Sequence, residues 1–492
     1  KVERIGDALP ENLLEVFEGG KLLAEDFFGL VDAWEMVGEP DVGYCIDLPD
    51  RLVAYQKALY LGIKAGAAEL GSSSQVESGE VNGETGEAES SRLAASDPST
   101  LNAQHPTAPA PLVLMGALAL PPGPWLERAM RNGLLDYTDA YNFHFYGNAD
   151  DLTGVIAAHG RATQRMSDDS RRMARGDPSS IFSPLFSVYQ RLTSVLRPPP
   201  SGLPLWITEC GINAVPADDF LNPVRRQKQA GFTLSTAKQA LAARDVAMFM
   251  PFILVHKNDP HAMTLSASQP LPAWDAYAEY MRTHPWPNRP LAAQAESPNP
   301  VVLQWMPSPG AAVAHKVSGT YRFWQRQPMH GEIRIYNFSA QPVQGKLRSV
   351  VPDVFRDPKS STSAGQTQIM VPAGGRLVVP VTFSCPASGY ARGDCEFAFA
   401  DSAGRESKAS FGLETWPDPR DFIETALPLK PLAGRKIRFR EFSDYRPGES
   451  AGPWQTINGL HATAADDGLG TVFWTDKVSL DPLMPAMAFA AI

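Results

Sequence analysis

Two glutamates in this 492-residue chain stand where an apolar run stops, a placement that suits acid–base or nucleophilic chemistry. Glu209 follows the apolar run 203–208 and precedes Cys210 and Gly211, and Glu39 follows the apolar segment 30–37. A lone strand-end glutamate could be a salt-bridge partner. A second one placed in the same way favours two carboxylates that face one cleft. Glycoside hydrolysis uses such a pair, one protonated and one ionised.

The segments between the two glutamates read as strands and helices in alternation. Residues 111–118 and 139–147 have the apolar composition of strands, and residues 125–136 read as a helix that Gly133 caps. In the second strand His144 and Tyr146 share one face, because side chains alternate along a strand. His144 could equally be a hydrogen-bonded histidine of the core.

The same alternation continues after Glu209. Helical periodicity covers residues 224–243, an apolar strand covers 247–256, and a helix with an aromatic stripe covers 272–281. The aromatic stripe is more typical of core packing than of a ligand site. His256 and Lys257 follow the strand and are expected on the same rim as the glutamates.

The segment Trp206-Ile207-Thr208-Glu209 and the Gly-Glu-Pro at Glu39 resemble the catalytic strands of retaining glycoside hydrolases of the (β/α)8-barrel clan A. The resemblance implies that Glu209 is the nucleophile at the end of the seventh strand and Glu39 the acid/base at the end of the fourth. It also implies a sugar-binding His-x-Tyr. The substrate-binding residues expected on these strands and their rim are Trp34, Asn142, His144, Tyr146, His256 and Lys257.

Within the clan the sequence is most similar to the β-xylosidase and α-L-iduronidase-like families, through the helix end 132–136 and the His-x-Tyr. The proposed reaction is double displacement on an oligo- or polysaccharide. The alternative is a noncatalytic carbohydrate-binding barrel that has lost turnover. A transglycosylase would use the same carboxylates.

Two features depart from the clan. Gly38 stands where most members have an asparagine that binds the sugar 2-hydroxyl, which allows another hydroxyl pattern, a substitute donor or lost activity. The first three barrel strands have no visible source, and a half barrel exposes its core. We expect a separate N-terminal fragment or a sequence that starts late, rather than permuted C-terminal strands.

The expected fold class is α/β, a TIM barrel that lacks its N-terminal strands, followed by all-β sandwich domains. The barrel domain covers 1–285 and contains strands four to eight and a flexible acidic insertion at 68–110. A linker at 286–300 leads to an Ig-like β-sandwich at 301–419, whose clearest strands are 331–339 and 375–383. The β-rich end, 420–492, with predicted strands at 436–440 and 471–474, reads as an incomplete sandwich.

Composition limits the partners and the compartment. A net charge of −10 argues against nucleic acid, and no uninterrupted apolar stretch is long enough to cross a membrane. Cys385 and Cys395 flank a predicted hairpin at a spacing that permits a disulfide, which fits a secreted or periplasmic protein. Cys45 and Cys210 lack an evident activating base. No metal-binding or cofactor motif occurs, so no metal or organic cofactor is expected.

Overall fold

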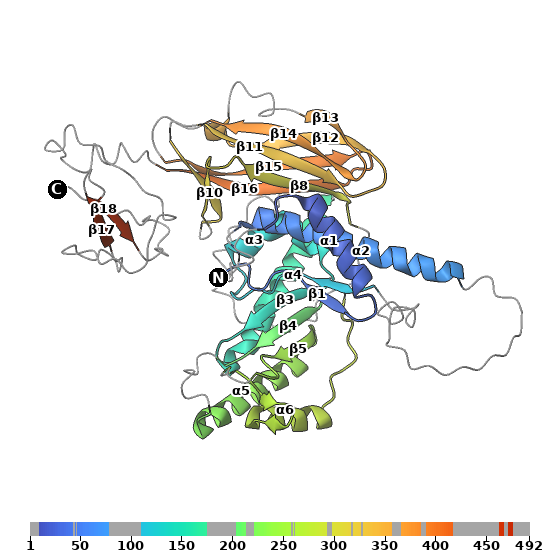
Figure 1. The fold of residues 1–492 in the computed structure, drawn as a ribbon, viewed down its shortest axis with the longest axis vertical. Helices are drawn as coiled ribbons and strands as arrows, with labels where there is room; N and C mark the ends of the chain where they lie inside the picture. Colours follow the sequence, from blue (N-terminus) through green and yellow to red (C-terminus); the bar gives the residue numbers. More distant parts are fainter. Residues whose placement is uncertain are drawn as a thin grey trace, which may run out of the picture.

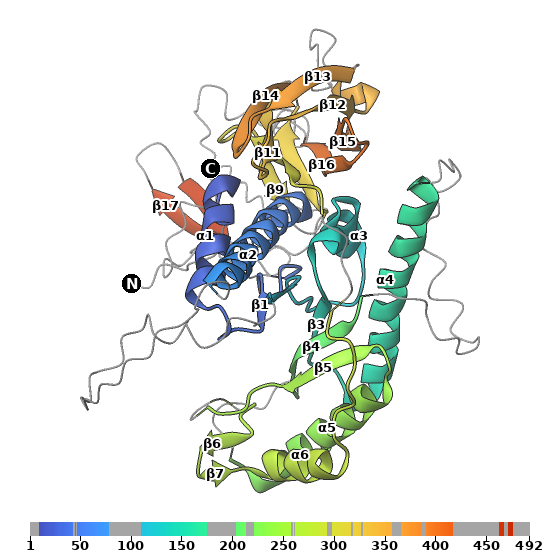
Figure 2. The ribbon, with the colours of Figure 1, turned by 90° about the vertical axis from the view of Figure 1, so that its right-hand side faces the viewer.

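The computed structural model places a β-sandwich beside a unit of parallel strands and helices (Figures 1 and 2). The residues that it describes are 9–42, 45, 47–77, 110–174, 203–212, 221–256, 259, 261–292, 298–315, 318–325, 328–356, 366–384, 390–416, 462–466 and 471–475. In both views the sandwich lies against α1 and α2, and the parallel strands extend from there towards α5 and α6.

Five strands of the first unit lie side by side in chain order and run in parallel. They are β1 (Ala33–Glu35), β2 (Leu112–Leu114), β3 (Tyr141–Phe145), β4 (Leu205–Cys210) and β5 (Val246–Pro251). β1 pairs with β2, β3 pairs with β4 and β4 with β5, and two bridges, Leu114 to Ala140 and Leu118 to Phe143, join β2 to β3. Each begins within a segment that its apolar pattern predicts as a strand, or one residue before it.

The described residues leave this sheet open. No strand among them pairs with the outer edge of β1 or with that of β5. A closed eight-stranded barrel is therefore not formed by the described part of the chain, and barrel closure stays a prediction. The carboxyl ends of the five strands nevertheless meet at one edge, which is where parallel sheets place their sites.

The helices of this unit are α1 (Leu13–Asp26), α2 (Pro49–Glu77), α3 (Pro124–Arg131), α4 (Leu152–Ala174), α5 (Pro223–Ala242) and α6 (Pro272–Thr283), with 3₁₀ turns at Leu134–Tyr137 and Ala149–Asp151. Asn12 and Asn222 cap α1 and α5 by accepting from the backbone N–H two residues on. Gly133 ends α3 with a φ of 78°, the left-handed conformation that glycine tolerates. None of the described helices combines the length and the apolarity that spanning a membrane requires.

One boundary in this unit differs from the prediction. Residues 68–77, assigned to the acidic insertion, continue α2, and Glu69 forms a salt bridge of 2.8 Å with Lys21 of α1. The cause is composition: glutamate is enriched in disordered segments, yet both glutamate and alanine are also strong helix formers. Residues 78–109 of that insertion lie outside the described part.

The sandwich packs a six-stranded sheet on a three-stranded one. The larger sheet has the order β13-β12-β15-β16-β10-β9 and the smaller β14-β11-β8. Buried aromatic side chains fill the space between the sheets, and Trp305 stacks on Phe411 at 4.7 Å. The bounds are β8 (Val301–Pro307), β9 (Val313–His315), β10 (Thr320–Trp324), β11 (Met329–Asn337), β12 (Val343–Val350), β13 (Gln366–Val371), β14 (Gly375–Phe383), β15 (Arg392–Asp401) and β16 (Glu406–Trp416), with a 3₁₀ turn at Asp353–Phe355.

Two small hairpins complete the described strands. β6 (Thr264–Ser266) and β7 (Gln269–Pro270) precede α6, and β17 (Ala462–Asp466) and β18 (Thr471–Thr475) form an antiparallel pair within the β-rich end. The strand at 471–475 is one that the sequence predicts, whereas the other predicted strand of that end, 436–440, lies outside the described residues.

Helix α2 joins the two units through buried contacts. Leu48, directly before α2, belongs to the core of the sandwich, and the Tyr321 hydroxyl donates to Asp50 Oδ2 at 2.9 Å. Ala54 and Ala58, one and two turns further on, pack with Val302 and with α1. The sandwich is thus fixed to the helical layer behind the strands rather than placed on a free linker.

Candidate active site

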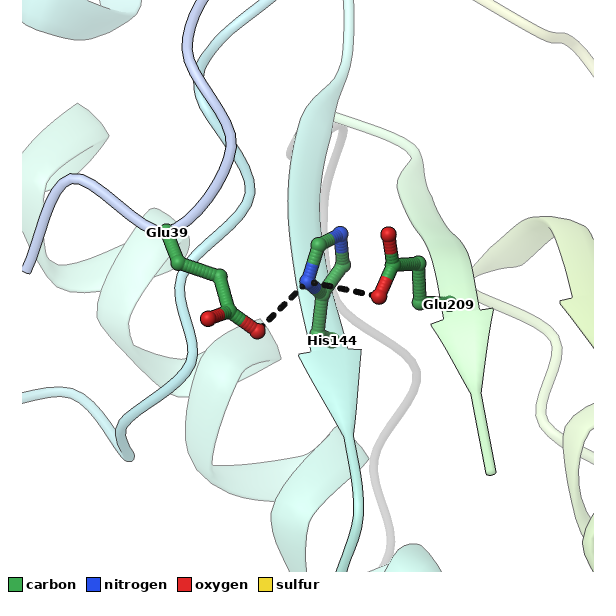
Figure 3. A group of neighbouring side chains, drawn as sticks. All are labelled: Glu39, His144 and Glu209. Carbon is green, nitrogen blue, oxygen red and sulfur yellow. Dashed lines mark hydrogen bonds and ion pairs between the residues drawn. The ribbon is translucent and has the colours of Figure 1, made fainter. Parts of the chain in front are cut away.

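Three side chains from three different strand ends meet at the carboxyl edge of the sheet (Figure 3). His144 Nδ1 lies 3.0 Å from Glu39 Oε1 and 3.5 Å from Glu209 Oε2, and one ligand atom from each of the three side chains lies within 4.8 Å of the other two. His144 is buried, whereas the carboxylates of Glu39 and Glu209 keep 18% and 30% of their side-chain surface exposed. The imidazole therefore forms the floor of an accessible carboxylate pair.

A second donor holds Glu209. The Tyr146 hydroxyl donates to Glu209 Oε2 at 2.6 Å, and burial together with this carboxylate raises the pKa of Tyr146, so the phenol stays a donor. Gly211 makes room for it, because a Cβ there would lie 2.7 Å from a carbon of the Tyr146 ring. The Tyr146 hydroxyl thus fixes Glu209 Oε2, and the His144 ring lies 3.5 Å from the same oxygen.

The backbone of the loop that carries Glu39, and not only its contact with His144, sets the position of this carboxylate. Its φ of 48° lies in the left-handed region, and no other non-glycine residue of the described part has a positive φ. The Glu39 N–H donates to Ala117 O at 2.9 Å, and Asp41 accepts from the N–H groups of Ala119 and Leu120. The loop after β1 is therefore tied to the end of β2, and this tie fixes where the Glu39 carboxylate points.

Beneath the pair lies a polar cluster that the sequence analysis missed. Glu35 Oε2 accepts from Asn142 Nδ2 at 2.8 Å and from the Thr208 hydroxyl at 3.0 Å, and Glu35 Oε1 lies 3.9 Å from His144 Nε2. The three residues come from β1, β3 and β4. The strand period that pairs His144 with Tyr146 also places Glu35 on the inner face of β1, so the alternation could have found it.

Asn142 and Trp34, two of the expected sugar contacts, have other positions. Asn142 is fully buried in the cluster with Glu35. Trp34 points to the opposite face of β1, where it packs edge-on against Phe27 and beside the core of α1 and α2. Strand alternation explains the difference, since Trp34 and Glu35 are neighbours in sequence and must face opposite sides.

The other residues singled out by the sequence lie beyond the end of β5, lie outside the described part of the chain or have open space beside them. His256 is exposed beyond β5, and its backbone N–H donates to Thr264 O. Lys257 and Cys385 lie outside the described residues, so the disulfide of Cys385 with the buried Cys395 stays a prediction. A Cβ on Gly38 would meet no atom within 4 Å, so its backbone does not require a glycine for space.

The chemistry at this edge is that of carboxylates. Cys210 is buried and its pKa is raised to about 12, which leaves a neutral thiol that is no nucleophile at neutral pH. Within the described part of the chain, Glu39, His144 and Glu209 also form a group that could hold a metal ion.

No protein-family model and no curated protein matches the sequence. Among solved structures, a GH128 (subgroup I) endo-β-1,3-glucanase of Amycolatopsis mediterranei in complex with laminarihexaose is 15% identical, with a TM-score of 0.23, over 36% of this chain and 61% of the glucanase. This chain thus covers under two thirds of that enzyme's length. A FixG-related protein of Vibrio parahaemolyticus (13% identity, TM-score 0.15) and the PapD-like domain of human CEP192 (10%, 0.18) match 23% and 27% of this chain, and 95% and 98% of their own. The solved structures that resemble parts of this chain thus include glycoside hydrolases.

Proposed function

We propose that the protein is a retaining glycoside hydrolase, with Glu209 as nucleophile and Glu39 as acid/base. The observation that carries the proposal is the spacing of the two carboxylates, since one oxygen of Glu39 and one oxygen of Glu209 lie within 4.8 Å of each other. Retaining glycosidases place their carboxyl groups about 5 Å apart, whereas inverting enzymes need roughly 6.5–9.5 Å to admit a water.

The roles follow from what each carboxylate contacts. The nucleophile must be ionised, and Glu209 accepts a hydrogen bond of 2.6 Å from the Tyr146 hydroxyl. It attacks the anomeric carbon as Glu39, protonated, gives its proton to the departing glycosidic oxygen. Glu39 then takes a proton from water, the hydroxide attacks the anomeric carbon, and Glu209 leaves as a carboxylate. Two inversions retain the configuration of the sugar.

We extend the proposal to the fold and the substrate. The five strands would be the fourth to eighth of a (β/α)8 barrel, with a polypeptide that supplies the first three strands as partner. This proposal is supported by the chain-order parallel pairing of β1 to β5 and by the placement of both glutamates at its carboxyl edge. The finer assignment, to β-xylosidase and α-L-iduronidase-like enzymes, rests on the residues at 132–136 and on His144 and Tyr146.

Activity on a panel of oligosaccharides tests the proposal. The panel covers xylo- and laminari-oligosaccharides and uronide-containing glycans, with the wild type compared with Glu209→Gln and Glu39→Gln. Each substitution is expected to lower kcat by at least about 100-fold, because each removes a group that acts in the transition state. Glu279→Gln on α6 is the matched control, since the exposed Glu279 side chain pairs with the exposed Arg282 on the same helix.

The stereochemistry decides the mechanism. A 2-deoxy-2-fluoro glycosyl fluoride of the active sugar should add one glycosyl mass to Glu209, and proton NMR should show the product anomer with the substrate's configuration. An inverted product, or label on another residue, contradicts the assignment. Glycan binding by calorimetry without turnover of any glycan would favour the noncatalytic carbohydrate-binding alternative, for which Gly38 in place of the clan's asparagine is the specific observation.

A further inference from the structure

The floor of the carboxylate pair has the composition and spacing of a transition-metal site. Two carboxylates and one imidazole are ligands that Zn²⁺ accepts, with bonds of about 2.0–2.2 Å. A tetrahedral ion with such bonds needs ligand atoms about 3.4 Å apart. His144 Nδ1 lies 3.0 Å from Glu39 Oε1 and 3.5 Å from Glu209 Oε2, and all three atoms are within 4.8 Å of one another.

The far nitrogen of the imidazole supplies an independent observation. When Glu39 is ionised, as a metal ligand must be, its carboxylate only accepts hydrogen bonds, so a neutral His144 that bonds it carries its proton on Nδ1. Nε2 is then a bare acceptor that faces another acceptor, Glu35 Oε1, at 3.9 Å. Nε2 is buried and has no hydrogen-bond partner within the described part of the chain. This arrangement is unfavourable for the singly protonated ring.

A metal ion on Nδ1 removes the mismatch. The Nδ1 lone pair would bind the ion, the ring proton would sit on Nε2, and the N–H would face the Glu35 carboxylate. Histidines that bind metals usually donate their second N–H to a carboxylate or carbonyl. Asn142 and Thr208 hold Glu35 in place for that role through its other oxygen.

The charge of the site points in the same direction. Glu35, Glu39 and Glu209 surround one imidazole, and within the described part of the chain each of them lies in ion-pair range of His144. A divalent cation between Glu39 and Glu209 would offset their charge. This site offers one nitrogen ligand and few protein oxygens, which suits Zn²⁺ better than Ca²⁺ or Mg²⁺, because those two ions prefer shells made of oxygen alone.

We propose that Glu39, His144 and Glu209 bind one Zn²⁺ or a similar first-row divalent cation, with Glu35 orienting His144, and that the bound ion blocks glycan hydrolysis. The blocking part rests on the proposed glycosidase function, because the ion would occupy both the nucleophile and the acid/base. The binding part stands on the three ligands alone. Zn²⁺ and substrate would then exclude each other.

Calorimetric titration of the full chain, stripped of metal with a chelator, with Zn²⁺ alone tests binding. One ion per chain is expected, with Mg²⁺ giving no saturable heat. Glu209→Gln and His144→Gln should abolish binding, and Glu35→Gln should weaken it about 10–100-fold, the usual effect of removing an orienting partner. Glu279→Gln should bind as the wild type. Because buried His144 is the riskier site to change, Glu209→Gln, with its partly exposed side chain, is the decisive variant.

The results of the binding and activity measurements test the metal site and the glycosidase function separately. Zn²⁺ binding that is absent, or that is unchanged in Glu209→Gln, overturns the metal site whatever the activity. If the wild type hydrolyses a glycan, Zn²⁺ should raise KM and leave kcat unchanged, and EDTA should reverse the effect; any other pattern overturns the mutual exclusion. A chain that binds Zn²⁺ at these residues and hydrolyses no glycan refutes the glycosidase proposal and supports the metal site.

Discussion

Replacing Gly211 by alanine tests whether Tyr146 must sit where it does for Glu209 to act. The new Cβ would lie 2.7 Å from a Tyr146 ring carbon and 3.2 Å from a His261 ring carbon. Carbon atoms in contact prefer at least about 3.5 Å, so the tyrosine ring must retreat by about 0.8 Å. Its hydroxyl then leaves the 2.6 Å bond to Glu209 Oε2. A hydrogen bond to a charged group is worth about 1.5–3 kcal/mol, which converts to roughly 10–150-fold in kcat.

The assay is steady-state kinetics on the best glycan of the panel, with urea unfolding of the same samples. Tyr146→Phe should lower kcat by a similar factor, and Gly211→Ala in that background should lower it little further, because the hydroxyl is already gone. The crowding should still cost about 1–3 kcal/mol of stability in both backgrounds. Gly231→Ala in α5 is the control, since its Cβ meets no atom within 4 Å. An unchanged kcat in Gly211→Ala, or effects that multiply fully in the double variant, would refute the reasoning.

Three further predictions concern stability, each measured by urea unfolding. Burial raises the pKa of Asp50 from 3.8 to about 7, so between these pH values the folded chain holds a proton that the unfolded chain has lost. The free energy of unfolding should therefore fall by up to roughly 4 kcal/mol as the pH rises from about 4 to 7. Asp50→Asn should lack this fall. A wild type with the same profile as Asp50→Asn contradicts this. Asn132→Ala loses two hydrogen bonds to the Ser410 backbone and should lower the free energy of unfolding by about 2 kcal/mol. Asp394→Asn should lower it by less than about 1 kcal/mol, because the ion pairs of Asp394 with two arginines are partly exposed. If Asp394→Asn costs more than Asn132→Ala, the argument from burial is wrong. Glu39→Gly should be about 1 kcal/mol more stable than Glu39→Ala because alanine keeps the left-handed strain, and equal stabilities would show that the φ of 48° costs nothing.

Apolar runs and strand alternation account for much of what could be predicted. Glu209 and Glu39 were found because a carboxylate at the end of an apolar run is conspicuous, and His144 and Tyr146 because two residues apart they share a face. The same alternation along the apolar segment 30–37 could have found Glu35, which faces the site while its neighbour Trp34 faces the helices. Trp34 was predicted to contact the sugar because it is aromatic, although the same alternation turns its side chain towards the helices.

The other misses concern tertiary context. The length of α2 depends on contacts such as Lys21 with Glu69, which a composition count of Ala, Ser and Glu does not reveal. Local sequence also gives no sign that Glu39 adopts a left-handed backbone, because the hydrogen bond from its N–H to Ala117 O spans 78 residues. Long-range pairing of this kind decides side-chain direction at the site and is invisible to local patterns.

The path of α2 bears on how this protein can be divided. Leu48 fills the core of the sandwich, Asp50 bonds Tyr321, and Gln56 Nε2 donates to Tyr137 O at 2.9 Å beside the parallel strands. One stretch of two to three helical turns thus belongs to both hydrophobic cores. A cut near residue 300 would leave each half with an exposed apolar face, so the two halves should melt in one cooperative transition, as a single foldon, rather than as independent modules.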